Sequence, residues 1–246
     1  DQDGSMYLID WYDANQCHHN RVDGHDRSNG RIYKVVYNNQ PATRIDLQKK
    51  SNAELVELQL SKNDFLARHA RRILQERGGD AATTAGLQKI LRENTDVTKQ
   101  LRALWSLHAT RKLTEADLLG LLAHQSEHLR SWAIQLLCED RQPGARALRE
   151  FARIAREDSS PMVRLYLASA MQRTPIAQRL PVLQALVSKG GDAGDHNLPL
   201  MYWYAMEPVV GNVPGAGLEL LTSSQIPLLR QYITRRLTTE SLANTR

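Results

Sequence analysis

SEHLRSWAIQLL (residues 126–137) and SPMVRLYLASAM (residues 160–171) follow one pattern, and that pattern decides the fold expected for most of the chain. In each stretch a serine precedes an apolar residue that is followed at once by an arginine, Arg130 or Arg164. Further apolar residues then return at helical spacing. Serine is a preferred residue at the N-cap of a helix. The two stretches therefore predict equivalent amphipathic helices in successive structural repeats.

The same plan extends outward from these two stretches in both directions. From about residue 52, a short amphipathic helix is followed by a polar turn and a second helix, and this order recurs every 31 to 35 residues. A sixth, less regular pair is expected between residues 218 and 237. The second helices are predicted to begin near Leu66, Val97, Leu129, Val163 and Leu198, after capping signals at Asn63-Asp64, Thr95-Asp96, Ser126, Ser159-Ser160 and Asp195.

A pair of helices of this length cannot bury its apolar face alone, so neighbouring pairs must stack on one another. The sequence therefore predicts a mostly α protein, an α-solenoid of about five to six helix pairs over residues 46–240. The apolar-arginine step resembles the signature of HEAT repeats. The arginine position holds Ala67, Thr98 and Pro199 in the other repeats, so the prediction is HEAT-like.

The N-terminal segment, residues 1–40, has a different periodicity. Residues 5–12 and 30–37 alternate loosely and are rich in β-branched and aromatic types, which predicts two strands. Two strands do not form an independent domain. They are expected to add to a further sheet or to pack on the helical part.

The loop between these strands contains the sharpest candidate for a metal site: Cys17, His18, His19 and His25. Thiolate and imidazole are preferred ligands of zinc and copper. Adjacent histidines in extended chain point to opposite sides, however, and no CxxC or HxxxH pair is present. The alternative is a polar loop braced by its aspartates. At the end of the first strand, Asp10 with Trp11 is a candidate for ligand contact, or else Trp11 packs and Asp10 caps a turn.

Two other stretches allow a functional and a structural interpretation. LPLMYWYAMEPVVG (residues 198–211) groups three aromatic residues that either line a groove or fill the core of the last large repeat, with Pro208 and Pro214 expected to end the helix. The series Arg146, Arg149, Arg153 and Arg156 lies along one helix face, where a solvated surface of mixed ion pairs is expected.

Composition restricts the classes of function. The chain is 41% hydrophobic and 24% charged, and its formal net charge of +5 is spread along the sequence, which argues against a nucleic-acid groove. No run of 18 apolar residues predicts a membrane span. No nucleophile, base and orienting residue stand at readable spacing, and no Walker, GxGxxG or HExxH motif occurs. Catalysis by these residues alone is not expected.

A family resemblance covers both halves of the chain. Asp10-Trp11-Tyr12-Asp13, Cys17-His18-His19-Asn20 and His25-Asp26-Arg27, followed by DHNLPLMYWYAMEP at 195–208, resemble bacterial membrane-bound dehydrogenases that join a sugar-dehydrogenase-like β-propeller to HEAT-like repeats and a c-type cytochrome. The resemblance implies that residues 1–40 are the closing strands of a truncated propeller. It implies haem c, and a quinone or calcium, in regions that this sequence lacks, and a periplasmic or secreted location.

On this interpretation the chain is a non-catalytic scaffold that holds its own propeller and cytochrome domains, or a protein partner. A binding surface would include Asp10, Trp11, Arg130 and Arg164. The sequence leaves two alternatives open. One is a HEAT-like nucleic-acid binder that resembles alkylpurine DNA glycosylases, and the other is a metal-binding module built on the Cys17 loop.

Overall fold

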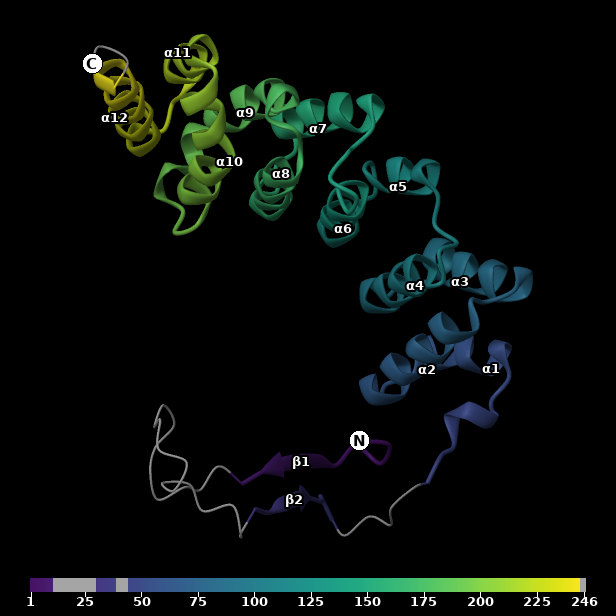
Figure 1. The fold of residues 1–246 in the computed structure, drawn as a ribbon. Coiled ribbons are helices and arrows are strands. Elements are labelled where there is room, and N and C mark those ends of the chain that lie inside the picture. Colours follow the sequence, from purple (N-terminus) through teal and green to yellow (C-terminus); the bar gives the residue numbers. More distant parts are fainter. Residues whose placement is uncertain (11–29, 39–43, 244–246) are drawn as a thin grey trace. The chain divides into compact units, whose positions relative to one another are not determined.

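A computed structural model describes residues 1–10, 30–38 and 44–243 of the chain (Figure 1). It divides into two compact units, Asp1–Lys112 and Leu113–Arg246, which are described separately below. The sequence predicted a boundary between the β segment, residues 1–40, and the helical domain, residues 46–240. The division at Lys112 lies within that helical domain, so the predicted boundary stays a prediction. The described helices include none long and apolar enough to cross a membrane.

The first unit contains a small sheet followed by two helix pairs. Helix α2 packs against α1 and α4, and α3 packs against α1 and α4. Its elements are β1 (Met6–Ile9), β2 (Ile32–Val35), α1 (Asn52–Glu57), α2 (Asp64–Arg77), α3 (Ala81–Glu93) and α4 (Val97–Ala109), with short 3-10 turns at Leu47–Lys49 and Leu58–Leu60.

The second unit contains four helix pairs. Its elements are α5 (Glu115–Leu121), α6 (Glu127–Leu137), α7 (Ala145–Glu157), α8 (Pro161–Arg173), α9 (Leu180–Val187), α10 (Leu198–Asn212), α11 (Pro214–Ser223) and α12 (Pro227–Ala243), with 3-10 turns at Ile176–Gln178 and Gly190–Gly194. The second helices α6, α8, α10 and α12 pack side by side in that order, and so do the first helices α7, α9 and α11 (Figure 1). The prediction of a mostly α fold of stacked helix pairs with a short N-terminal β segment is confirmed.

The predicted starts of the second helices are close to the observed ones, but the buried register differs between the units. Leu129, Val163 and Leu198 are fully buried in the second unit, as expected. In the first unit Leu66 and Val97 are only half-buried. The buried face of α2 and α4 begins instead at Ala67 and Gln100, and the Gln100 side chain donates a hydrogen bond to the Leu91 carbonyl oxygen at 3.1 Å. Hydrophobic periodicity does not detect a buried glutamine that satisfies a buried carbonyl group.

Most of the predicted capping residues do cap a helix. The side chains of Asn63, Asp96 and Ser160 accept backbone N–H groups at the starts of α2, α4 and α8, respectively. Ser126 is at the N-cap of α6 but makes no side-chain cap. Pro208 does not end a helix as expected, because α10 continues to Asn212. An interior proline removes one backbone hydrogen bond and crowds the carbonyl group four residues earlier, and α10 tolerates both at Pro208.

The two predicted strands pair in an antiparallel hairpin that is shorter than expected, with Met6 opposite Val35 and Ile9 opposite Ile32. Its apolar side chains are exposed on both faces, and Ile9 and Ile32 are 72% and 74% exposed. The chain before β1 is tied to the helical part, because the Asn63 side-chain amide donates to the carbonyl oxygens of Asp1 and Gln2 at 2.9 and 3.0 Å. The hairpin is therefore anchored at its base but has no covering layer among the described residues.

Candidate interaction surface on the second helices

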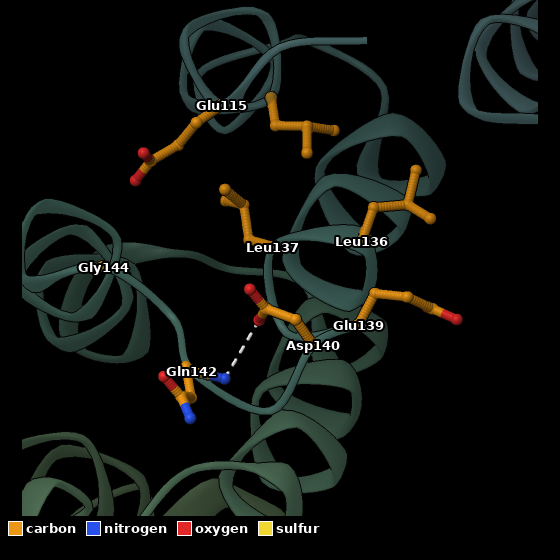
Figure 2. Close-up of a pocket in the computed structure, with 8 residues that line it drawn as sticks. Glu115, Leu136, Leu137, Glu139, Asp140, Gln142 and Gly144 are labelled. Atoms are coloured by element: carbon orange, nitrogen blue, oxygen red, sulfur yellow. Dashed lines mark hydrogen bonds between the residues drawn. The ribbon is translucent and has the colours of Figure 1, made fainter. Parts of the chain in front are cut away.

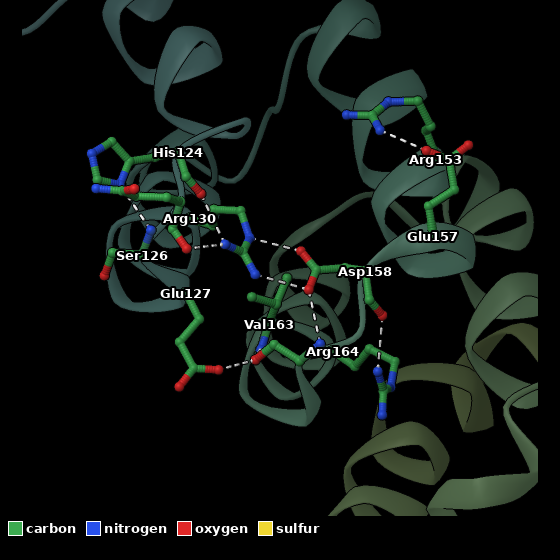
Figure 3. Close-up of polar contacts among 11 residues, drawn as sticks. His124, Ser126, Glu127, Arg130, Arg153, Glu157, Asp158, Val163 and Arg164 are labelled. Atoms are coloured by element: carbon green, nitrogen blue, oxygen red, sulfur yellow. Dashed lines mark hydrogen bonds and ion pairs between the residues drawn. The ribbon is translucent and has the colours of Figure 1, made fainter.

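The two arginines that opened the sequence pattern hold successive second helices together, and Figure 3 shows the first of these links, from Arg130 to Asp158. Arg130 of α6 donates from Nε and Nη2 to the carboxylate of Asp158, at 2.7 and 3.0 Å, and Asp158 lies just before α8. Arg164 of α8 donates in the same bidentate way to Asp192, at 2.7 and 2.6 Å, ahead of α10. Each aspartate follows its arginine by 28 residues. We call these two pairs the Arg–Asp ladder.

The second pair of the ladder is the more buried. The side chains of Arg164 and Asp192 are only 9% and 6% exposed, and the phenol of Tyr202 donates a third hydrogen bond to Asp192 at 2.7 Å. Hydrogen bonding to Asp192 raises the pKa of Arg164, while burial and the same carboxylate raise the pKa of Tyr202. Tyr202 is therefore a neutral donor at any ordinary pH. One carboxylate thus connects α8 and α10.

Each ladder arginine also binds a backbone carbonyl group in the turn before its own helix. Nη1 of Arg164 donates to the Asp158 carbonyl oxygen at 3.0 Å, and Nη1 of Arg130 donates to the carbonyl oxygen of His124 at 2.8 Å (Figure 3). Charge-assisted bidentate bonds fix geometry more tightly than single neutral bonds. The observed partners of Arg130 and Arg164 are thus intramolecular, and their proposed contact with a ligand stays a prediction.

The other predicted site residues lie at the N-terminal end. The carboxylate of Asp10 pairs with the guanidinium of Arg31 at 3.3 Å. Trp11 and the candidate metal ligands Cys17, His18, His19 and His25 lie outside the described residues. The rest of the chain, as far as the structure describes it, contains no group of three or more His, Cys, Asp or Glu side chains that could hold a metal ion. The metal hypothesis stays a prediction that elemental analysis of purified protein would test.

A small groove on the second helices lies beside the ladder. It is about 310 Å³ and is lined by residues of α6, α8 and α10: Gln135, Leu165, Tyr166, Ser169, Asn197 and Met201. We call it the amide groove. All six lining side chains are uncharged, and no hydrogen bond between its polar side chains and the rest of the described chain is present.

Asn197 is available to a ligand because another residue caps α10. The carboxylate of Asp195 accepts the N–H groups of Asn197 and Leu198 at 2.8 and 2.9 Å, which leaves the Asn197 side-chain amide without that role. Gln135 supplies a second unpaired amide from α6. Each amide offers two donors and one acceptor oxygen, which are the groups that complement the main chain of an extended peptide.

Large side chains continue the surface on either side of the amide groove. Trp132, Tyr166, Met201 and Tyr232 occupy matching places on α6, α8, α10 and α12, and each is half-buried. The predicted aromatic cluster of α10 is divided between core and surface. Tyr202 is fully buried, Trp203 packs at 5.3 Å from the Tyr232 ring, and Tyr204 is 55% exposed. The core interpretation of residues 198–211 therefore holds for Tyr202, and the binding interpretation of its aromatic rings stays a prediction.

A second hollow of about 420 Å³ lies between α5, α6 and the start of α7 (Figure 2). It has acidic side chains, but two of them have structural partners. Asp140 accepts the Gln142 N–H at 3.0 Å and so closes the turn between α6 and α7, and Glu139 pairs with Arg173 at 3.6 Å. This hollow is therefore a feature of the inter-helix turn.

Nucleophilic chemistry finds no support around these surfaces. Cys138 at the end of α6 is fully buried, and burial raises the pKa of its thiol to about 12. The thiol is therefore protonated at neutral pH. A protonated thiol is a poor nucleophile, because the reactive form of cysteine is the thiolate. The arrangement on α6, α8 and α10 offers unpaired amides, hydroxyls and aromatic rings, which suit binding.

Comparisons with known proteins add little to this description. No protein-family model matches the chain. No curated protein matches it either. Among solved structures, it is similar to an engineered protein determined by a structural genomics consortium, with 15% identity and a TM-score of 0.44 over 78% of this chain and 93% of that one.

The sequence could have pointed to part of this site. Asp158 and Asp192 each stand 28 residues after a ladder arginine, a recurrence visible without a structure. The free amides of Gln135 and Asn197 could not have been found in that way, because their availability depends on which neighbours cap which helix. Neither was a candidate in the sequence analysis.

Proposed function

We propose that the chain is a non-catalytic interaction module that binds an extended segment of a protein partner along its second helices. The amide groove is the observation that carries this proposal. Unpaired Gln135 and Asn197 amides flank an apolar floor that includes Leu165 and Met201. Amides of this kind match peptide N–H and C=O groups, while the apolar floor takes a side chain.

The Arg–Asp ladder supports this proposal through rigidity. Because Asp158 and Asp192 fix the starts of α8 and α10 relative to the preceding helix, the groove residues on three helices keep their spacing. A binding surface that is already ordered loses less conformational entropy when its ligand arrives.

For the parent protein, we propose the setting that the family resemblance implies. The module would join a β-propeller and a c-type cytochrome in a periplasmic or secreted dehydrogenase that acts on a carbohydrate-like substrate. The exposed apolar side chains of β1 and β2 support this proposal, because two strands with both faces bare need a further layer, which the strands of a propeller would supply.

Peptides selected from a random display library against the 246-residue chain would test the binding proposal. We expect Gln135→Ala with Asn197→Ala to weaken the selected peptides about tenfold or more, because two hydrogen-bonding groups are lost. A matched control, Gln172→Ala with Gln231→Ala, removes two exposed amides elsewhere and should leave affinity unchanged. Equal loss in both variants, or selected peptides that bind outside the groove, would refute the proposal.

The parent proposal is tested by the coding sequence on either side of this chain. A propeller-encoding region before residue 1 and a CxxCH motif after residue 246 are expected. Unrelated flanking sequence would remove the dehydrogenase setting and leave the binding proposal untouched.

A further inference from the structure

Another groove, larger than the amide groove, lies on the first helices between α7 and α9. Its volume is about 680 Å³, within the range of sites that bind ligands. Leu148 and Ala152 of α7 form one apolar wall, and Ala177 and Val182 form the other. We call it the first-helix groove.

Two arginines of α7 line the first-helix groove, and both are free. Arg149 and Arg156 are exposed, and neither makes an ion pair or a side-chain hydrogen bond within the described part of the chain. Arg153, on the same helix, behaves differently, because it pairs with Glu150 at 3.0 Å and Glu157 at 2.7 Å. The expected surface of mixed ion pairs on α7 thus holds for Arg153 but not for the two groove arginines.

A third cation strengthens the positive end of the first-helix groove. The ammonium group of Lys189 donates to the carbonyl oxygen of Arg156, at the C-terminal end of α7. No acidic side chain is among the residues that line the groove. The groove therefore combines an apolar floor with unneutralised positive charge on one side.

We propose that the first-helix groove binds an acidic amphipathic helix of a protein partner. Arg149 and Arg156 are seven residues apart, which is two helical turns and about 10.5 Å along the axis. A helix that lies along α7, with carboxylates seven residues apart beside an apolar face, would meet both guanidinium groups and the floor together. This surface is on the opposite layer of helices from the amide groove, so it does not depend on the function proposed above.

The chemistry of the groove favours this ligand over two others. A fatty acid has a single carboxylate and would leave one guanidinium group unused. A nucleic acid would place its phosphates over an apolar floor and beside the carboxylates of Glu150 and Glu157. A peptide helix satisfies both the charge and the apolar surface.

The test uses the whole 246-residue chain and a fluorescein-labelled helical peptide of about 18 residues, five turns long. The peptide has leucines on one face and two glutamates seven residues apart at the edge of that face. A second peptide has glutamine in place of both glutamates. We expect Arg149→Glu with Arg156→Glu to weaken binding of the glutamate peptide about tenfold or more, because attraction becomes repulsion.

Two further variants separate the groove from general charge. Lys62→Glu with Arg235→Glu removes two exposed cations outside the groove and lowers the net charge by the same amount, so it should change affinity less than about twofold at moderate salt. Ala177→Trp fills the groove without any change of charge and should weaken binding about fivefold or more. Circular dichroism spectra would confirm that each variant is folded.

The outcomes divide clearly. Selective loss with the groove variants, and weaker binding of the glutamine peptide, would support the proposal. Equal binding of both peptides, equal loss with the control variant, or no binding of the glutamate peptide would overturn it. So would binding of laurate or of duplex DNA that depends on Arg149 and Arg156 while the peptide fails to bind.

Discussion

Asp192 shows how a single residue can hold two repeats. Its carboxylate accepts two hydrogen bonds from Arg164 and one from Tyr202, and all three side chains are nearly inaccessible to water. A buried ion pair is weak evidence for stability in itself, because desolvation offsets the attraction. Removal of one partner is costly nevertheless, because the other charge stays buried and unpaired.

We therefore expect Asp192→Ala to lower the free energy of unfolding by about 3–5 kcal/mol. Arg164 would be left as an uncompensated buried cation, and the Tyr202 hydroxyl would lose its acceptor. Urea denaturation followed by circular dichroism measures this change. Arg153→Ala, which removes an arginine whose two ion pairs are exposed, is the matched control and should cost less than about 1 kcal/mol. Similar losses in the two variants would show that the ladder has no special role.

At the scale of the element, α1 depends on a reciprocal cap that responds to pH. The Glu54 carboxylate accepts the backbone N–H of Ser51 at 2.8 Å and the Lys50 ammonium at 2.9 Å, while the Ser51 hydroxyl accepts the Glu54 N–H. The backbone N–H of Ser51, then Lys50, lower the pKa of Glu54 from 4.5 to about 2. A lowered carboxyl pKa means that the folded state favours the ionised form.

We expect Glu54→Gln to lower the melting temperature at neutral pH, because the charged acceptor is lost. The stabilisation by ionised Glu54 is fully present above pH 4.5 and disappears as the pH falls through about 2. The difference in melting temperature between the two proteins should therefore shrink between these pH values. Melting curves recorded by circular dichroism across this range would measure it, and a constant difference would contradict the role of the charge.

The β1–β2 hairpin is the element with the least support from the described chain. Ile9 and Ile32 face each other across the strands, and both are largely exposed. Substitution of both by threonine keeps β-branched residues in the strands. We expect unfolding free energy to change by less than about 0.5 kcal/mol and binding of the dye ANS to fall. A large loss of stability would show that these side chains are covered in solution.

The helix pairs could be predicted from sequence because their signals are local. Apolar spacing and capping residues recur with the repeat, and most of the predicted N-caps are observed. The buried register in the first unit could not be predicted, because Gln100 enters the core through a hydrogen bond to the Leu91 carbonyl oxygen rather than through hydrophobicity. The partners of Arg130 and Arg164 were only partly visible, because the 28-residue spacing to Asp158 and Asp192 recurs in the sequence but does not show that the fold brings these side chains together.

At the scale of the whole molecule, the two units differ in which neighbouring repeat their linking arginines bind. The arginines of the second unit bind an aspartate later in the chain, and the arginine of the first unit binds one earlier in the chain. In the second unit Arg130 and Arg164 reach forward to an aspartate before the next second helix. In the first unit Arg102 of α4 reaches back, donating to Asp64 at 3.1 Å and to the Ser61 carbonyl oxygen at 2.6 Å. Each unit therefore has its own polar link between second helices. In repeat proteins, stability is the sum of terms within repeats and between nearest neighbours.

This local character predicts how damage spreads. We expect Asp192→Asn to increase amide hydrogen exchange in α8 and α10, where the carboxylate joins the helices, and to leave α2 and α4 unchanged. The reverse should hold for Asp64→Asn, which weakens the link to Arg102 of α4 and an exposed ion pair with Arg68 within α2. Hydrogen exchange read by mass spectrometry on peptides from each unit distinguishes the two patterns. If either substitution accelerated exchange equally in both units, the chain would unfold as one cooperative body, and the nearest-neighbour account of its stability would fail.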